Sequence, residues 1–239
     1  MLFETYYKRS RSPFYSFIFI LPLFLIYELG IWMIASKDLP TIRNGADVLL
    51  RKILLNLGIT GIYGMALALL IGIIIAFFIN RGKFSEIKIN TNYFMLMIFE
   101  SLIWSGILFT ILRQGQLLLS VGSAKLFFQQ IVLSIGSGIF EEFIFRLVLV
   151  SGLILILGIF IKKRYWYKIF FAILFSAIIF SSFHFIGEFA EVPSTASFFI
   201  RLIAGIVLGY VYVLRGFGIA AYAHSFYNLL VFTQISGST

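Results

Sequence analysis

The chain has 239 residues, of which 61% are hydrophobic and only 12% are charged, and its mean hydropathy is +1.02. A soluble domain is about 45–50% apolar and about 25% charged, so this composition excludes a free-standing soluble globule and a disordered chain. The absence of cysteine excludes a disulfide framework and a cysteine nucleophile. The net charge of +9 comes from Lys and Arg clusters beside apolar runs, as membrane headgroups favour, so we expect no nucleic-acid partner.

Apolar runs long enough to cross a membrane follow one another through the chain. A helix needs about 20 apolar residues to cross roughly 30 Å of hydrocarbon. The runs are Phe14–Ala35, Leu57–Ile79, Tyr93–Leu112, Leu126–Ile161, Trp166–Ile186, Phe198–Leu214 and Phe217–Phe232. The fourth run would form a rod of about 54 Å, so we expect a break near Ser151-Gly152 and seven or eight spans in total. The predicted fold class is all-α, a polytopic transmembrane helix bundle that forms a single domain over residues 1–239.

Charged residues gather in the short connections between these runs. The segment from Lys37 to Lys52 is amphipathic, with Asp47 and Arg51 on one helical repeat, and we expect it to lie along the membrane interface. A basic cluster precedes the first apolar run, which is longer than the hydrophobic region of a signal peptide. We therefore expect an uncleaved first span with a cytoplasmic N-terminus.

The pair Glu141-Glu142, followed by Arg146, lies inside the apolar run Leu126–Ile161. Ionisable residues cost about 2.5–3.5 kcal/mol each at the centre of a spanning helix and commonly mark a functional site. Glu142 and Arg146 are four residues apart, so they share a helix face and can form an ion pair. Glu141 points about 100° away and has only Ser137 at helical spacing. We therefore expect Glu142 to be structural and Glu141 to be a general base.

Both histidines of the chain lie in or at the edge of apolar runs. His184 follows Phe180 by four residues, and His224 precedes Asn228 by four residues inside Phe217–Phe232. An imidazole and an amide can both donate hydrogen bonds to a developing oxyanion. Taken alone, a buried histidine more often serves helix packing, and an asparagine often bonds neighbouring helices. The joint occurrence of the three patterns favours chemistry over packing.

Two further carboxylates lie within apolar runs. Glu28, beside Tyr27, is interpreted as a polar contact between helices. Glu100 has no interpretation from the sequence.

Three motifs of the chain together resemble the signature of the CPBP intramembrane proteases, the CAAX protease and bacteriocin-processing family that is also called Abi. These motifs are Glu141-Glu142…Arg146, Phe180…His184 and His224…Asn228. They occur in the order of the family, and the resemblance implies a four-helix catalytic core over residues 126–232, preceded by N-terminal spans and an amphipathic connector over 1–125. The first spans are similar to a bacterial subgroup, which implies a bacterial inner (cell) membrane.

The resemblance also implies an activity, that of an intramembrane endopeptidase similar to CAAX prenyl proteases. Glu141 and His184 would activate the water that attacks the scissile carbonyl, and His224 and Asn228 would form the oxyanion hole. The substrate would be a peptide or a lipid-modified peptide, met among membrane lipids. The oligomeric state is left open.

The remaining two motif residues, Glu142 and Arg146, would hold the motif helix in its geometry. We favour a mechanism without cofactor or metal, because the chain has no His-Glu-x-x-His pair. Two histidines and a carboxylate are a legitimate ligand set, so a zinc ion at Glu141, His184 and His224 stays an open alternative.

Two other functional classes remain open. In a proton- or ion-coupled transporter, the carboxylate and imidazoles would form a relay; the lack of an inverted repeat in the sequence argues against it. In a non-catalytic membrane scaffold or immunity protein, the motifs would serve folding or partner binding.

Overall fold

The computed structural model describes residues 2–34, 44–56, 58, 89–112, 124–161, 165–186, 190 and 192–236. Every regular element within these ranges is a helix, so the predicted all-α fold class is confirmed for the described part of the chain. The predicted run Leu57–Ile79 and the basic connection after it lie outside the described residues. The number of spans, seven or eight, therefore stays a prediction.

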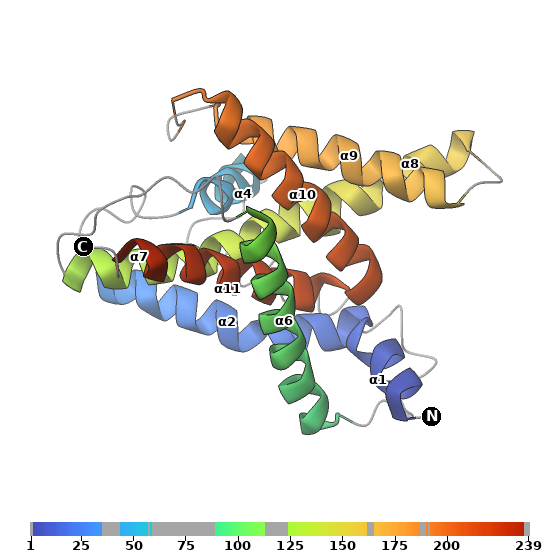
Figure 1. Cartoon of the computed structure of the whole chain (residues 1–239), viewed down its shortest axis with the longest axis horizontal. Helices are drawn as coiled ribbons and strands as arrows, with labels where there is room; N and C mark the ends of the chain where they lie inside the picture. The colour runs from blue at the N-terminus through green and yellow to red at the C-terminus, as the bar shows by residue number, and fades with distance from the viewer. Residues whose placement is uncertain are drawn as a thin grey trace.

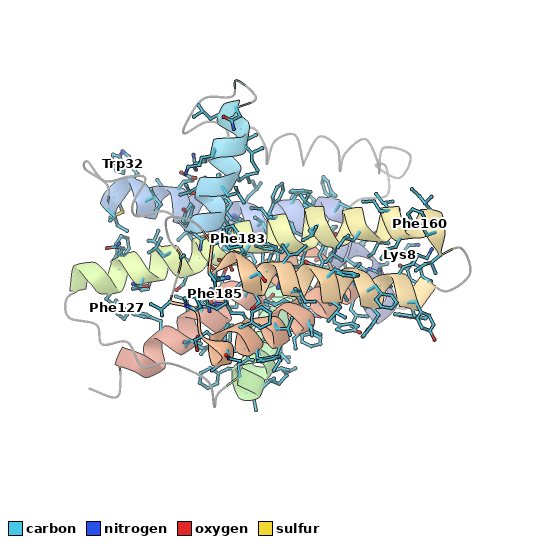
Figure 2. All side chains as sticks on the ribbon, turned by 90° about the horizontal axis from the view of Figure 1, so that it is seen from above. Lys8, Trp32, Phe127, Phe160, Phe183 and Phe185 are labelled. Carbon is cyan, nitrogen blue, oxygen red and sulfur yellow. The ribbon has the colours of Figure 1, made fainter. Side chains whose placement is uncertain are left out.

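Most of the helices run along the long axis of the molecule, and α6 runs across them (Figure 1). In chain order they are α1 (Leu2–Ser10), α2 (Pro13–Ile34), α4 (Gly45–Asn56), α6 (Thr91–Leu112), α7 (Ala124–Glu142), the π-helix η3 (Phe143–Val150), α8 (Ser151–Phe160), α9 (Tyr165–Phe183), α10 (Thr195–Arg215) and α11 (Phe217–Ser236). Figure 2 shows Trp32 and Phe127 at one end of the bundle and Lys8 and Phe160 at the other. The first span and the long helix α7–η3–α8 are therefore antiparallel.

Five helices are long and apolar enough to cross a membrane. They are α2, α6, the continuous helix over Phe127–Phe160, α9 and α10, and α11 is apolar over the shorter stretch Phe217–Phe232. Each corresponds to one of the runs predicted from the sequence, with ends that differ by a few residues. The chain is a multi-pass membrane protein.

The fourth predicted run forms one unbroken helix, and the expected break near Ser151-Gly152 was wrong. Ser151 has the helical dihedral angles φ −63° and ψ −43°. A glycine weakens a helix by only about 1 kcal/mol, whereas a broken helix in lipid leaves backbone groups without hydrogen bonds. The irregularity occurs earlier, in η3, where the hydroxyl of Ser176 in α9 donates to the carbonyl of Phe145 at 2.6 Å. Such π-helical turns are frequent at functional sites.

Glycines bring α7 into close contact with α2 and α11. A Cβ atom added at Gly136 would lie 2.2 Å from the ring of Tyr27 in α2. One added at Gly138 would lie 2.6 Å from the backbone nitrogen of Ser225 in α11. Small residues allow helix backbones in membranes to approach closely. This contact holds the end of α7, where the two motif carboxylates lie, directly against α11.

The described part of the amphipathic connector, α4, turns its charges toward the bundle. Asp47 is fully buried and accepts hydrogen bonds from the Tyr27 hydroxyl at 2.7 Å and from Nε of Arg51 at 2.6 Å. Arg51 also donates to Glu28 at 2.6 Å. α2 thus supplies buried partners that the amphipathic pattern does not reveal, and the expectation that the connector lies along the membrane interface stays a prediction. The interpretation of Glu28 as a contact between helices is confirmed.

Glu100 of α6, which the sequence left without interpretation, anchors α1 and the end of α10. Arg215 donates to both of its carboxylate oxygens and to the Ser10 hydroxyl, and Tyr6 donates to Glu100 at 2.8 Å. Burial and the adjacent Glu100 carboxylate raise the pKa of the Tyr6 phenol above its usual value. This cluster stabilises the packing of three segments far apart in the sequence.

Candidate active site

Four separate segments bring polar side chains together inside the bundle. Glu141 lies near the end of α7, His184 follows the last residue of α9, His224 lies in the first half of α11, and Asn44 precedes α4. Glu141 and His224 are only 3% and 5% exposed, and the His184 side chain is 20% exposed. Phe183, the last residue of α9, lies well inside the length of the bundle (Figure 2). The cluster is therefore an interior site rather than a surface one.

The Glu141 carboxylate faces both imidazoles. Its Oε1 atom lies 4.0 Å from Nε2 of His184, and its Oε2 atom lies 3.8 Å from Nε2 of His224. Both distances are too long for a direct hydrogen bond. A water molecule about 2.8 Å from each of two atoms can bridge such a gap. Each of these two pairs thus has the spacing of two groups that one water molecule can bridge.

His184 is held by the backbone of its own helix. Its Nδ1 atom lies 3.0 Å from the carbonyl oxygen of Phe180. A carbonyl oxygen only accepts hydrogen bonds, so Nδ1 carries the proton in this contact. In the neutral ring, Nε2 then presents its lone pair toward Glu141. The four-residue spacing in Phe180…His184 has a physical reason: the last helical turn orients the imidazole.

Glu142 lies fully buried between a guanidinium and an imidazole. Its Oε2 atom lies 3.2 Å from Nε of Arg146, so the predicted i,i+4 ion pair is present, and its Oε1 atom lies 2.8 Å from Nδ1 of His224. Arg146, 1% exposed, also donates to the Gly205 carbonyl at 3.5 Å and lies 4.5 Å from the centroid of the Phe180 ring. The pair therefore links η3 to α9, α10 and α11.

Asn228 lies one turn after His224 and contacts the first motif through a hydroxyl. Its amide nitrogen donates to Oγ of Ser137 at 3.2 Å, its one hydrogen-bond partner within the described residues. The Ser137 hydroxyl is in turn a hydrogen-bond partner of Glu141. An amide has two N–H groups, so one remains for another acceptor.

Asn44 is a site residue that the motifs did not reveal. Its amide nitrogen donates to Oε1 of Glu141 at 3.0 Å, while its own oxygen accepts from the backbone N–H of Ala46 at 2.8 Å. Helical spacing offered Glu141 only Ser137, because such spacing reveals partners within one helix and Asn44 belongs to another segment. Asparagine before an amphipathic helix is a typical N-cap, which predicts where α4 begins. No local signal predicts its contact with a residue 97 positions later.

The arrangement of donors bears on the zinc alternative. Within the described part of the chain, no group of three or more His, Asp or Glu side chains is placed to hold a metal ion. Two ligands of a tetrahedral zinc ion, each about 2.1 Å from it, lie about 3.4 Å apart. The two pairs around Glu141 are wider, at 4.0 and 3.8 Å, and use different carboxylate oxygens. The spacing is thus wider than that of directly coordinated ligands, and the metal-free mechanism stays a prediction.

Comparison with known proteins assigns the region that carries all three motifs. Residues 123–230 match a family model described as type II CAAX prenyl endopeptidase Rce1-like. No curated protein and no solved structure matches the chain. The match begins at the start of α7 and ends within α11, so it includes the helices that carry Glu141, His184 and His224. Over residues 123–230 the chain is similar to the Rce1-like CAAX prenyl endopeptidases, which confirms the resemblance drawn from the motifs.

Proposed function

We propose that the protein is an intramembrane endopeptidase that hydrolyses a peptide bond with a water activated by Glu141 and His184. The observation that carries the proposal is the spacing around the Glu141 carboxylate, 4.0 Å to His184 and 3.8 Å to His224. The family match over residues 123–230 supports peptide hydrolysis as the reaction class. Low exposure of the carboxylate supports a site from which bulk water is largely excluded.

The reaction begins with a proton transfer from the bound water. Glu141 accepts this proton, and the water oxygen forms a bond to the scissile carbonyl carbon. Nε2 of His184 holds the water through its lone pair, since its other nitrogen is bonded to the Phe180 carbonyl. The tetrahedral intermediate then collapses, the C–N bond breaks, and the proton passes from Glu141 to the departing amine.

The negative oxygen of the intermediate would be stabilised by His224 and Asn228. Because Nδ1 of His224 is bonded to Glu142, its Nε2 atom donates only when the ring carries two protons. The Glu142 carboxylate balances that charge, and Arg146 holds Glu142 in place. Asn228 contributes the amide N–H that Ser137 does not use. Preorganised donors of this kind are each worth about 10²–10³ in rate.

The substrate that this family match favours is a peptide or a lipid-modified peptide that reaches the site from the membrane. The mechanism requires no metal, since carboxylate and imidazole suffice to activate the water. We therefore expect a chelator to leave activity unchanged and added zinc to give no increase.

The experiment compares the purified protein in lipid bilayers with Glu141→Gln and His184→Ala, using prenylated and unmodified peptide libraries and mass spectrometry of the products. Glu4→Gln, a change of the same type at an exposed site, is the matched control. We expect cleavage to fall by about 10²–10⁴-fold in both site variants and to be unchanged in the control.

Four results would argue against the proposal. Full cleavage by Glu141→Gln would exclude this carboxylate as the base. Loss of cleavage with a chelator and its return with zinc would favour the metal alternative. Proton-coupled uptake without cleavage would favour a transporter, and a cellular phenotype that survives Glu141→Gln but not Arg146→Leu would favour a scaffold.

A further inference from the structure

A cavity separate from the candidate active site lies at the end of the bundle where α2 and α11 begin and α10 ends. Its volume is about 350 Å³, within the roughly 300–1,000 Å³ of small-molecule sites. Its walls are mainly apolar and come from α2, η3, α8, the start of α9, α10 and α11. Glu141, His184 and His224 are not among its lining residues. The cavity is therefore distinct from the candidate active site.

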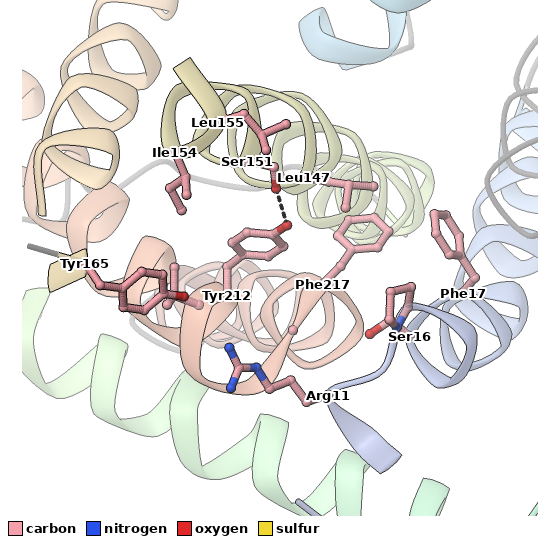
Figure 3. Close-up of a pocket in the computed structure, with 13 residues that line it drawn as sticks. Arg11, Ser16, Phe17, Leu147, Ser151, Ile154, Leu155, Tyr165, Tyr212 and Phe217 are labelled. Carbon is pink, nitrogen blue, oxygen red and sulfur yellow. Dashed lines mark hydrogen bonds between the residues drawn. The ribbon is translucent and has the colours of Figure 1, made fainter. Parts of the chain in front are cut away.

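Few polar groups line this cavity, and they suit an anion. Arg11 contributes the only charge among the lining residues, and no carboxylate of the described chain pairs with it. Ser16 is 1% exposed, and its hydroxyl has no hydrogen-bond partner in the described part of the chain. The hydroxyls of Tyr212 and Ser151 bond each other at 2.6 Å on the other side (Figure 3). The cavity is thus lined both by a buried hydroxyl without a partner and by an exposed arginine without a carboxylate partner, and a phosphate group can bond both.

The cavity lies at the level of the membrane surface. Tyr165, Trp166 and Tyr167 begin α9 at this end and are 55%, 67% and 50% exposed. Exposed aromatic residues at the end of an apolar helix mark the headgroup level of a bilayer. Tyr165 itself lines the cavity (Figure 3). These residues indicate that the cavity lies near the level of the phosphate headgroups.

The apolar wall continues onto the surface that faces lipid. α8 has no buried residue, and Leu155, which lines the cavity, is 75% exposed. Leu147 and Ile154 extend the same wall along the long helix. A free phosphate ion would leave this wall without a partner, whereas an acyl chain would cover it.

We propose that the cavity binds an anionic glycerophospholipid. Its phosphate lies between Arg11 and Ser16, and one acyl chain runs along Leu147, Ile154 and Leu155. The bound lipid joins the start of α2 to α8 and to the turn between α10 and α11, and so stabilises the end of the bundle opposite Trp32.

The test measures lipid binding to the delipidated full-length protein in detergent, by native mass spectrometry and by thermal shift. The probes are phosphatidylglycerol and, as the headgroup without chains, glycerol phosphate. We expect phosphatidylglycerol to bind and to raise the melting temperature, and glycerol phosphate to do neither. Arg11→Ala should weaken lipid binding on the order of tenfold or more, while Lys8→Ala, the same change of charge outside the cavity, should not.

A second variant separates the chain from the headgroup. Leu155→Trp adds a larger side chain at an exposed position of the apolar wall, where it leaves folding intact. This variant retains Arg11 but should bind phosphatidylglycerol more weakly, because the acyl chain loses part of its contact surface. Three results would each overturn the proposal. Arg11→Ala and Lys8→Ala could bind the lipid equally well, Leu155→Trp could bind it as the unchanged protein does, or glycerol phosphate could give the full response. The measurement has no catalytic readout, so its failure and that of the proposed peptidase activity are distinguishable.

Discussion

The contact between α7 and α11 at Gly138 sets the positions of Glu141 and Glu142 relative to His224. In Gly138→Ala, the new Cβ atom would lie 2.6 Å from the backbone nitrogen of Ser225 and 2.8 Å from the carbonyl oxygen of Ala221. Ordinary contact begins at 3.4 Å, so the two helices must separate by about 0.6–0.8 Å. Because both neighbours are backbone atoms, no side-chain rotation relieves the clash.

This displacement acts directly on the site. Gly138 lies one turn before Glu141 and Glu142, and Ser225 directly follows His224. The separation therefore lengthens the 2.8 Å contact from Glu142 to His224 and the 3.8 Å gap from Glu141 to His224. A misplacement of about 1 Å costs on the order of 10² in rate, and overpacking costs about 1–3 kcal/mol of stability. We expect a loss of cleavage of about 10- to 100-fold with a lowered melting temperature.

The matched control is Gly152→Ala in the same long helix, where an added Cβ atom meets nothing within 4 Å. There alanine should stabilise the helix by about 0.5–1 kcal/mol and leave cleavage unchanged. Peptide cleavage and thermal unfolding are measured for both variants under one condition. If Gly138→Ala matches Gly152→Ala in rate and stability, the inferred close contact between α7 and α11 is incorrect.

Three further outcomes follow from the buried contacts. Arg146→Leu leaves Glu142 buried without its cation and should lower the free energy of unfolding by about 3–5 kcal/mol. Removing both charges together should cost less than the sum of the single changes, and additive losses would contradict the pairing. Asn44→Ser retains an N-cap for α4 but is too short to reach Glu141, so we expect nearly unchanged thermal stability with reduced cleavage, and unchanged cleavage would exclude a positioning role. The raised pKa of Tyr6 predicts a pH dependence: above about pH 10 the unfolded phenol loses its proton while the folded one retains it, so stability falls as pH rises. Tyr6→Phe should reduce this alkaline slope of the melting temperature, and identical slopes would contradict the burial of the phenol against Glu100.

Local features of the chain were sufficient for the fold class and for part of the site. Transfer of a helix into lipid depends on its own residues, so composition and run length predicted the apolar helices that the structure describes. The Glu142–Arg146 pair followed from spacing alone, since both residues lie on one helix and the helical period places them together.

Tertiary packing decided which groups meet around Glu141. The contacts of Asn44 with Glu141 and of Glu142 with His224 join residues 97 and 82 positions apart, and no periodic pattern encodes such pairs. These contacts depend on which helices become neighbours. The neighbours are determined by the glycines at which two backbones can approach and by the buried charges that pair with a residue on another helix. The inward orientation of the charges of α4 and the π-helical turn before Ser151 have the same origin. A polar group in a low-dielectric interior adopts the geometry in which neighbouring groups form hydrogen bonds with it, even where the local sequence favours another geometry.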